Sequence, residues 1–524
     1  MLGAGLVLRI AGLLLSVAAF VGRESGTAGW MGLHWSLDAV SAPFLVAAFL
    51  ALGNRPGQVG AAALALLAGD GAVLLLALAC CAALNPWLPH GAVRWGRVRT
   101  AVPVACLAVA LLLLATAHGF TPGFAGLRAA APDGGRATAV LVLTVIGALP
   151  FLRGAGGGLG VYLLCRVLID LCGPAAPVWS GVPLLALGTA AAVWGSVRAA
   201  SADDLRGGLG AAATAQAGLA VTGIGIAAAA RGADLPPLAG LALSAALVLM
   251  LNAAVLGALL HLCAGAVARG VGGTALASLG GLARRMPGTV LAALVGAAGL
   301  AAVPPLAGFT GVWLLLQCLL AARFGGLAMQ LVFAAALAGT GAASAVLAAA
   351  ALRWVGLGFL GRPRSTAAAA AAEAPRAARL CMAALAGLVV LFGVVPGLVV
   401  VAVQPAVRLL GLAGLEDGHW LVLAPVPDGP VYAPLGMLGL LIGSAAAAVV
   451  LVRFAAVPGV SLVPVWEGGA ARAGSLTAAY APGLLQPLRA WHRVLDQMRP
   501  PGVRQLVGLL ALVLAASAIW VAAR

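Results

Sequence analysis

The sequence consists largely of long apolar runs separated by short gaps that carry arginine. A helix needs roughly 20 apolar residues to cross the hydrocarbon core of a bilayer, and most of the runs approach this length. Hydrophobic residues make up 63% of the 524 residues and charged residues only 8%, with a mean hydropathy of +1.11. A soluble core cannot bury so large an apolar fraction. The chain is therefore predicted to be an all-α polytopic membrane protein, surrounded by the lipid bilayer.

The apolar runs predict about 14 to 15 transmembrane helices, because each helix needs a run of this kind. The count depends on the run 58–86, which is long for one span and short for two. Gly69, Asp70 and Gly71 at its centre could form a hairpin tip. We expect a transmembrane domain over residues 1–453, a cytoplasmic or interfacial segment with an amphipathic helix over 454–504, and a last transmembrane helix over 505–524.

One apolar run, from Met286 to Leu320, is much longer than a single span and is interrupted by Pro304 and Pro305, with Gly308 shortly after. Proline removes backbone donors and glycine loosens the following turn. One interpretation is a single helix broken at membrane depth, where other helices or a water-filled cavity satisfy the freed carbonyls. The other is two ordinary spans joined by a Pro-Gly turn.

All thirty basic residues are arginine, and the net charge is +16. In a soluble chain this charge would suggest a nucleic-acid partner, but here the arginines lie between apolar runs and set the topology instead. With the Pro304–Pro305 run counted as one crossing, the main arginine clusters share one face, which the positive-inside rule makes cytoplasmic. The C-terminus is then outside, and the side of the N-terminus depends on the run 58–86.

Several motifs, in this order, resemble the hydrogenase-4 component B / formate hydrogenlyase subunit 3 family. The family belongs to the antiporter-like membrane subunits shared with respiratory complex I and Mrp-type antiporters. The motifs are Gly32–Ser41, Ala202–Arg206, Leu279–Pro287, Val303–Phe309 and Phe359–Arg364, followed by the tail segments Pro464–Gly469, Leu476–Tyr480 and Gln486–Leu488. The resemblance covers nearly the whole chain. It implies an antiporter-like fold with inverted repeats and broken helices, in a multi-pass protein of the inner (plasma) membrane.

The family's proton relay uses a glutamate, lysines and histidines buried near the middle of the membrane, and most of these are missing here. The position that resembles the glutamate lies in Ala77–Ala79, and a block with histidine and lysine is absent around Arg153–Gly158. In the stretch Val248–Gly257 only Asn252 of the family's polar pattern remains. Where the family has a serine-glutamate-tryptophan pattern after the Pro-Pro break, this chain has Gly311–Trp313, and only the tryptophan is kept.

The family's last lysine falls at Arg353, which keeps the charge but cannot release its proton. Either Arg353 contributes to an ion path, or it is a helix-end side chain that reaches the cytoplasmic face. Arg166 and Asp170 are four residues apart and can pair on one helix face; such a pair is either structural or part of a relay. His261 is interpreted as a hydrogen-bonded core histidine.

The other candidates are Asp204 and Arg206, which resemble the family's Asp-Leu-Lys beside a broken span. Asp38 is expected to cap the helix that follows it. Eight cysteines lack metal-ligand spacing. The sequence has no motif for catalysis, a cofactor or a metal. The resemblance likewise implies a non-catalytic membrane subunit.

The function implied by the resemblance is that of an antiporter-like subunit in a complex-I-related, hydrogenase-type oxidoreductase complex. Its partners would be other antiporter-like membrane subunits and hydrogenase-like redox subunits. Such a subunit is nominally proton translocating, but the missing relay residues favour a degenerate, structural role in this chain. The alternative is a stand-alone membrane transporter for a cation or a small solute.

Overall fold

The computed structural model describes residues 26–454 except for short gaps at 31–32, 39–40, 52–55, 69, 84–92, 117–123, 130–133, 153–156, 173–177, 323, 325, 416–419 and 426–428. The first apolar run, the interfacial segment beyond residue 454 and the last expected transmembrane helix lie outside the described residues. The domain division expected from the sequence therefore stays a prediction.

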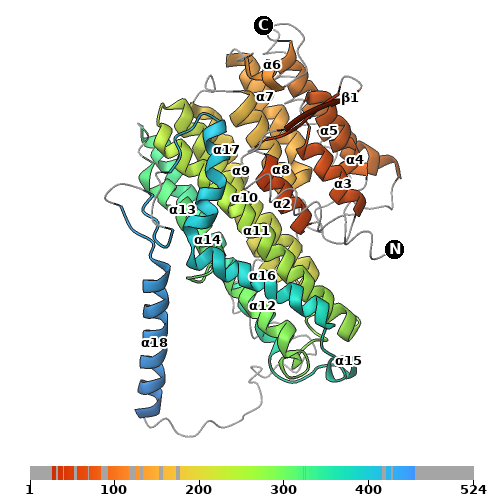
Figure 1. Ribbon diagram of the computed structural model, residues 1–524, viewed down its shortest axis with the longest axis vertical. Helices are drawn as coiled ribbons and strands as arrows, with labels where there is room; N and C mark the ends of the chain where they lie inside the picture. The colour runs from red at the N-terminus through yellow and green to blue at the C-terminus, as the bar shows by residue number, and fades with distance from the viewer. Residues whose placement is uncertain are drawn as a thin grey trace.

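Helices form nearly all of the described structure (Figure 1). The first half contains α2 (Ser41–Ala51), α3 (Pro56–Leu66), α4 (Gly71–Ala83), α5 (Val93–Ala115), α6 (Phe124–Ala129), α7 (Gly134–Ala148), α8 (Gly157–Leu164), α9 (Gly181–Ser201) and α10 (Leu205–Gly232). The second half contains α11 (Pro236–Val271), α12 (Pro287–Leu300), α13 (Ala307–Ala321), α14 (Leu327–Trp354), α15 (Thr366–Ala369), α16 (Arg376–Val394), α17 (Pro396–Leu409) and α18 (Pro434–Phe454).

Short turns of other helix types join these elements. The 3₁₀ helices are η1 (Leu149–Leu152), η5 (Val178–Ser180) and η6 (Leu282–Arg284), and the π-helices are η3 (Cys165–Leu171) and η7 (Val355–Phe359). A small antiparallel sheet of β1 (Gly26–Trp30) and β2 (Leu33–Leu37) pairs Gly26 with Leu37. The all-α class is confirmed, and this hairpin is an addition that the apolar pattern did not predict.

Among the described residues, seven helical segments are long and apolar enough to cross a membrane. They are 135–152, 178–201, 205–232, 236–271, 327–359, 376–394 and 434–451. Shorter apolar helices accompany them at 72–81, 102–115, 287–300, 307–321 and 396–409. The run 58–86 forms two helices, α3 and α4, which pack on each other. Asp70 Oδ1 accepts a hydrogen bond from Val73 N at 2.8 Å and so caps the second helix.

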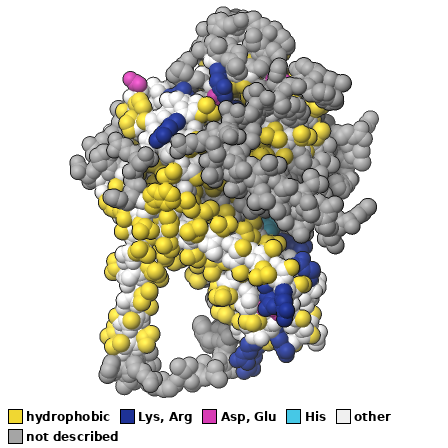
Figure 2. All heavy atoms as spheres, viewed as in Figure 1, with side chains coloured by type: hydrophobic (Ala, Val, Ile, Leu, Met, Phe, Trp, Pro, Cys, Tyr) yellow, Lys and Arg dark blue, Asp and Glu magenta, His cyan; other side chains and the backbone are white. Residues whose placement is uncertain are grey.

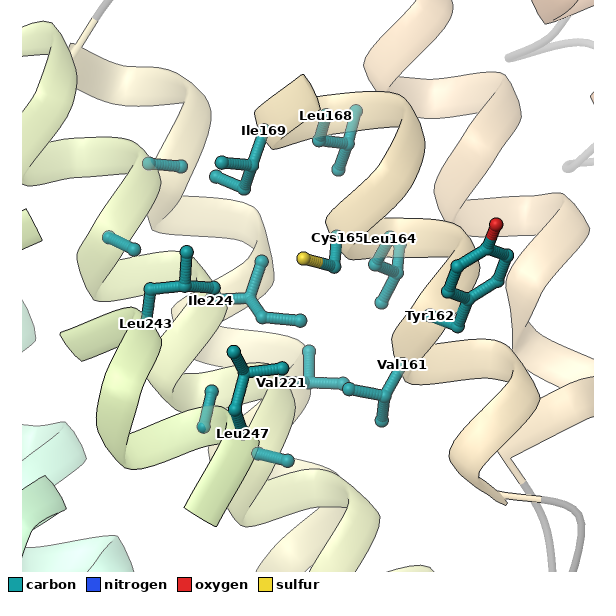
Figure 3. Close-up of a cluster of buried hydrophobic side chains, with 14 of the residues drawn as sticks. Val161, Tyr162, Leu164, Cys165, Leu168, Ile169, Val221, Ile224, Leu243 and Leu247 are labelled. Atoms are coloured by element: carbon teal, nitrogen blue, oxygen red, sulfur yellow. The ribbon is translucent and has the colours of Figure 1, made fainter. Parts of the chain in front are cut away.

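The centre of the bundle is formed by α10 and α11, in which most residues are buried. Around them lie α2 to α8 on one side and α12, α13, α14, α16 and α17 on the other (Figure 1). The close-up in Figure 3 shows how α8 and η3 pack against this centre: Val161, Cys165 and Ile169 face Val221, Ile224, Leu243 and Leu247.

The helices α9 and α10 meet along a seam of small residues. Gly181, Gly188 and Gly195 recur every seven residues on α9, and Gly218 and Gly225 do so on α10. A Cβ atom at Gly188 would lie 2.4 Å from the backbone nitrogen of Thr222, and one at Gly218 would lie 2.4 Å from that of Ala192. The two backbones are therefore in direct contact, as in small-residue interfaces between membrane helices.

Helix α18 stands apart from the other helices (Figure 1), and nearly all of its side chains with described burial are exposed. At the lower end in Figure 2, near α12, α15 and α16, the surface carries arginine. The arginine clusters 284–285 and 353–379 both belong to this end, because Arg364 donates to the carbonyl of Leu276, in the loop that leads to Arg284 and Arg285. This agrees with the expectation that these two clusters share one face.

Candidate functional site

The Pro304–Pro305 break separates α12 from α13, and both helices follow α11. Gly296 lies against Leu260 of α11, Gly299 lies against Leu256, and Gly311, beyond the break, lies against Leu249. From the start of α12 to α13, the contacted residues of α11 thus have progressively lower numbers. This order is that of one broken span that runs antiparallel to α11. If the break were a turn between two antiparallel spans, the order of the contacted residues along α11 would reverse after it.

Asn252 holds the start of the second half of this span. Its Nδ2 donates a hydrogen bond of 2.5 Å to the carbonyl oxygen of Ala307, the first residue of α13. Asn252 is 2% exposed, and its Oδ1 accepts no hydrogen bond from the described residues. The one polar residue kept from the family's pattern in this stretch therefore anchors the backbone beside the break.

The chain on either side of the break is packed closely enough to require glycine. A Cβ atom at Gly308 would lie 1.8 Å from the carbonyl oxygen of Gly299. On α16, a Cβ atom at Gly393 would lie 2.1 Å from the carbonyl oxygen of Pro305. Tyr432 Oη donates to the carbonyl oxygen of Gly393 at 3.2 Å, and its ring contacts Phe309. The break is thus enclosed by packed backbone and aromatic side chains.

Arg166 and Asp170 pair on the π-helix η3, at 2.7 Å between Nη1 and Oδ2. The pair belongs to a larger cluster. Arg166 Nη2 also contacts Asp38 Oδ2, and Arg128 of α6 binds Asp170 with two hydrogen bonds, at 2.6 Å and 2.9 Å. The cluster of Asp38, Arg128, Arg166 and Asp170 contains two acids and two guanidinium groups, so its net charge is zero.

Arg166 is fully buried at the centre of this cluster. Its Nε donates to Tyr162 Oη at 3.2 Å, and its Cζ lies 5.0 Å from the ring centre of Phe124, within reach of a cation–π interaction. A buried arginine keeps its charge when it is paired and hydrogen-bonded in this way. The arrangement ties α2, α6 and η3 together, with each of the three guanidinium nitrogens of Arg166 donating one hydrogen bond to a neighbouring side chain.

Asp38 does cap α2, as expected, because its Oδ1 accepts from Ser41 N at 2.8 Å. Burial raises the pKa of Asp38, but the charge of Arg166 and the hydrogen bonds from Arg166 and Ser41 outweigh burial and hold that pKa below its usual value. Asp38 is therefore an anion that links a helix cap to the buried guanidinium. Sequence reasoning missed Arg128, which lies 42 residues from its partner Asp170.

Arg353 lies at the end of α14 and points into the bundle. The alternative that it reaches the aqueous face is wrong, because it is only 1% exposed. Its Nη1 donates to the carbonyl oxygens of Ala200, at 2.7 Å, and Ala202, at 2.6 Å, and its Nη2 lies 3.2 Å from Asp203 Oδ1. Arginine in this position satisfies the last carbonyls of α9 and complements the negative end of that helix.

Asp204 and Arg206 have different environments. Asp204 is the N-cap of α10: its Oδ2 accepts from Gly207 N at 2.9 Å, and its Oδ1 accepts from the hydroxyl of Thr274. Arg206 is exposed. His261 is half-buried on α11, and its Nδ1 lies 2.8 Å from the carbonyl oxygen of Gly257 one turn earlier. The interpretation of His261 as a hydrogen-bonded histidine agrees with this contact.

The candidates do not converge on one site. Arg166 and Asp170 belong to the cluster near η3, Asn252 to the break, and Arg353 with Asp204 to the junction of α9 and α10. The position expected for the family's glutamate is apolar and packed, with Leu78 fully buried in α4. No group of three or more histidine, cysteine or acidic side chains among the described residues is placed to hold a metal ion.

Comparison with known proteins bears on the fold. Residues 151–338 match the family described as NADH:quinone oxidoreductase/Mrp antiporter, TM. A chain in the structure of the membrane-bound sulfane sulfur reductase, an archaeal respiratory membrane complex, is similar over 98% of this chain and 95% of its own length, with 18% identity and a TM-score of 0.70. The chain has the antiporter-like fold.

Two further structures share the antiporter-like fold. A chain of the Mrp complex from Dietzia sp. DQ12-45-1b is 22% identical over 99% of this chain, with a TM-score of 0.64, and the similarity spans 60% of that longer chain. A chain of respiratory complex I from Thermus thermophilus with bound NADH is 19% identical over 78% of this chain and 95% of its own, with a TM-score of 0.64. No curated protein matches the sequence.

Proposed function

We propose that the chain is an antiporter-like membrane subunit of a complex-I-related, hydrogenase-type assembly in the plasma membrane, where it supports neighbouring subunits and does not relay protons along its own side chains. The antiporter-like fold over nearly the whole chain supports the first part. The hydrogenase-type assignment rests on the ordered sequence motifs, including the tail segments Pro464–Gly469 and Leu476–Tyr480.

The observation that carries the structural role is the environment of Arg353. Its guanidinium group donates to two carbonyls at the end of α9 and pairs with Asp203. A proton relay needs a group that releases and regains a proton near neutral pH, which arginine does not do. At the position where the family uses a lysine, this chain therefore has a helix cap.

The other ionisable candidates support the same conclusion. Arg166, Asp170, Asp38 and Arg128 neutralise one another, and Asp204 caps α10. His261 is bonded to a carbonyl of its own helix and has no ionisable partner within hydrogen-bonding distance among the described residues. Except for His261, these groups cap helices or join segments to one another, and among the described residues no hydrogen bonds connect them into a row along the bundle.

A pull-down of the tagged chain in mild detergent, followed by mass spectrometry, tests the assembly. We expect hydrogenase-like redox subunits to be recovered together with other antiporter-like chains. Recovery of the chain alone, followed by cation or solute transport by this chain in liposomes, would contradict the proposal and support the stand-alone transporter.

A further inference from the structure

A recess opens at the end of the bundle where α10 finishes and α9 begins. Its walls come from α7, the end of η3, η5, α9 and α10, and include Thr138, Ile169, Cys172, Trp179, Ser180 and Arg231. The recess is partly enclosed and open on one side. Most of the wall is apolar, and its polar side-chain groups are the Arg231 guanidinium, the hydroxyls of Thr138 and Ser180, the Trp179 indole N–H and the Cys172 thiol.

Ser180 is the first indication that the recess receives a ligand. It is 7% exposed, and its hydroxyl has no hydrogen-bond partner among the described residues. It immediately precedes α9, where serine usually caps the helix, yet its side chain makes no capping hydrogen bond. Buried hydroxyls are normally hydrogen-bonded, so a group inside the recess is needed to complete this one.

Arg231 is the second indication. It is half-buried near the end of α10, and its Nη1 donates to the carbonyl oxygen of Ile169 at 2.6 Å. No carboxylate among the described residues forms an ion pair with it. The nearby Asp170 already binds Arg128 and Arg166 in the neutral cluster. Arg231 therefore adds one positive charge that no carboxylate of the described residues pairs with, and a partly desolvated charge is stabilised by a counterion.

The helix geometry adds to this positive potential. The 3₁₀ turn η5 runs directly into α9, so the continuous helix from Val178 to Ser201 has its positive end in the turn Val178–Ser180, of which Trp179 and Ser180 line the recess. A helix start favours anions because its first backbone N–H groups point outward along the dipole. A guanidinium, a spare hydroxyl and a helix start thus converge on one recess whose lining includes no carboxylate.

We propose that this recess binds a phosphate-type oxyanion, supplied by the headgroup of a membrane phospholipid. Arg231 donates to the phosphate oxygens in the manner usual for arginine–phosphate pairs, and the Ser180 hydroxyl donates to a third position. Trp179 is 46% exposed beside the recess, and tryptophan is typical of the headgroup level of the bilayer. The apolar walls provide contact for the glycerol and the first methylenes.

The test is native mass spectrometry of the purified full chain in detergent, titrated separately with phosphatidylglycerol and with inorganic phosphate. We expect stable phosphatidylglycerol adducts on the wild type. Arg231→Gln weakens this binding on the order of tenfold, because a charge-assisted pair is lost, and Ser180→Ala weakens it by a smaller factor. Arg198→Gln, an exposed arginine at the other end of α9, leaves the binding unchanged.

The comparison of ligands identifies the source of the oxyanion. Saturation by inorganic phosphate without phosphatidylglycerol adducts would overturn the lipid as the source. Equal phosphatidylglycerol binding by wild type and Arg231→Gln would overturn the site itself. If Arg231→Gln does not fold, Arg231→Lys and Ser180→Ala replace it: Arg231→Lys is expected to retain binding and Ser180→Ala to reduce it, and equal binding by wild type and Ser180→Ala would then overturn the site.

Discussion

Arg353 Nη1 lies 2.6 Å from the carbonyl oxygen of Ala202 and so binds the end of α14 to the end of α9. Two residues 151 positions apart in the sequence are thus joined at the point where the chain leaves α9 and enters α10. The positive charge is buried because it satisfies helix-end carbonyls that would otherwise lack donors. The effect of replacing Arg353 on stability can therefore be measured separately from its effect on ion transport.

Arg353→Ala is expected to lower the free energy of unfolding by about 2–4 kcal/mol, since buried carbonyls left without a donor each cost roughly 1–3 kcal/mol. Proton pumping per assembled complex is expected to stay unchanged. Thermal unfolding in detergent and proton uptake by proteoliposomes, normalised to assembled complex, measure the two effects. Arg362→Ala, at an exposed position, is the control. Loss of pumping with intact assembly would contradict the proposed structural role.

Arg166→Met is expected to destabilise the protein by about 3–5 kcal/mol, because it leaves two carboxylates with only the half-exposed Arg128 as a partner. The triple variant Asp38→Asn, Arg166→Met, Asp170→Asn should recover much of this loss, since it leaves no unpaired buried charge. Unfolding midpoints of the three proteins measure the difference. A triple variant no more stable than Arg166→Met would show that the cluster does not act through charge balance.

Gly188→Ala is expected to separate α9 from α10, because its Cβ would lie 2.4 Å from the backbone of Thr222. Overpacking of this kind typically costs about 1–3 kcal/mol. Gly210→Ala on α10 is the matched control: a Cβ there meets nothing within 4 Å, and alanine favours the helix by up to about 1 kcal/mol. Equal unfolding midpoints for both variants would refute the close contact.

Glu373 gives the protein a pH-dependent contact outside the spans. Its Oε2 accepts from Gly288 N at 2.7 Å and its Oε1 from Thr289 Oγ1 at 2.6 Å, at the start of α12. Burial raises the pKa of Glu373, but the hydrogen bonds from Thr289, Ala374 and Gly288 outweigh it and hold that pKa below its ordinary value.

A carboxyl whose pKa is lowered by folding stabilises the protein at pH values above its unfolded pKa, and this contribution disappears as the pH falls through the folded pKa. Glu373→Gln should therefore unfold more easily than the wild type at pH 7, by about 1 kcal/mol for a lost helix cap. The difference should shrink below about pH 4. Unfolding midpoints at pH 7 and pH 3.5 test this, and a constant difference would contradict it.

The apolar pattern predicted the helical class and the partnership of Arg166 with Asp170, because these depend on neighbours within a few turns. It left open whether the run 58–86 is one span or two, and the structure has two helices there. It could not predict that Asp38 and Arg128 complete the same cluster, since both come from distant segments. It also left two alternatives at Pro304–Pro305, which only the order of contacts along α11 resolves. The sequence placed Arg353 at a helix end but did not show whether its side chain points toward solvent or into the bundle. The side chain points into the bundle because it binds the carbonyl oxygen of Ala202, 151 residues away in the sequence.

The backbone contact between α9 and α10 also bears on how the protein enters the membrane. The two helices are consecutive in the chain and are joined by only three residues, 202–204. Their interface depends on glycines of these same helices. We expect them to close into a helical hairpin as soon as both have left the translocon, before α11 has entered the bilayer beside them. The long, buried α11 then inserts against a preformed surface, and the order of synthesis becomes the order of assembly.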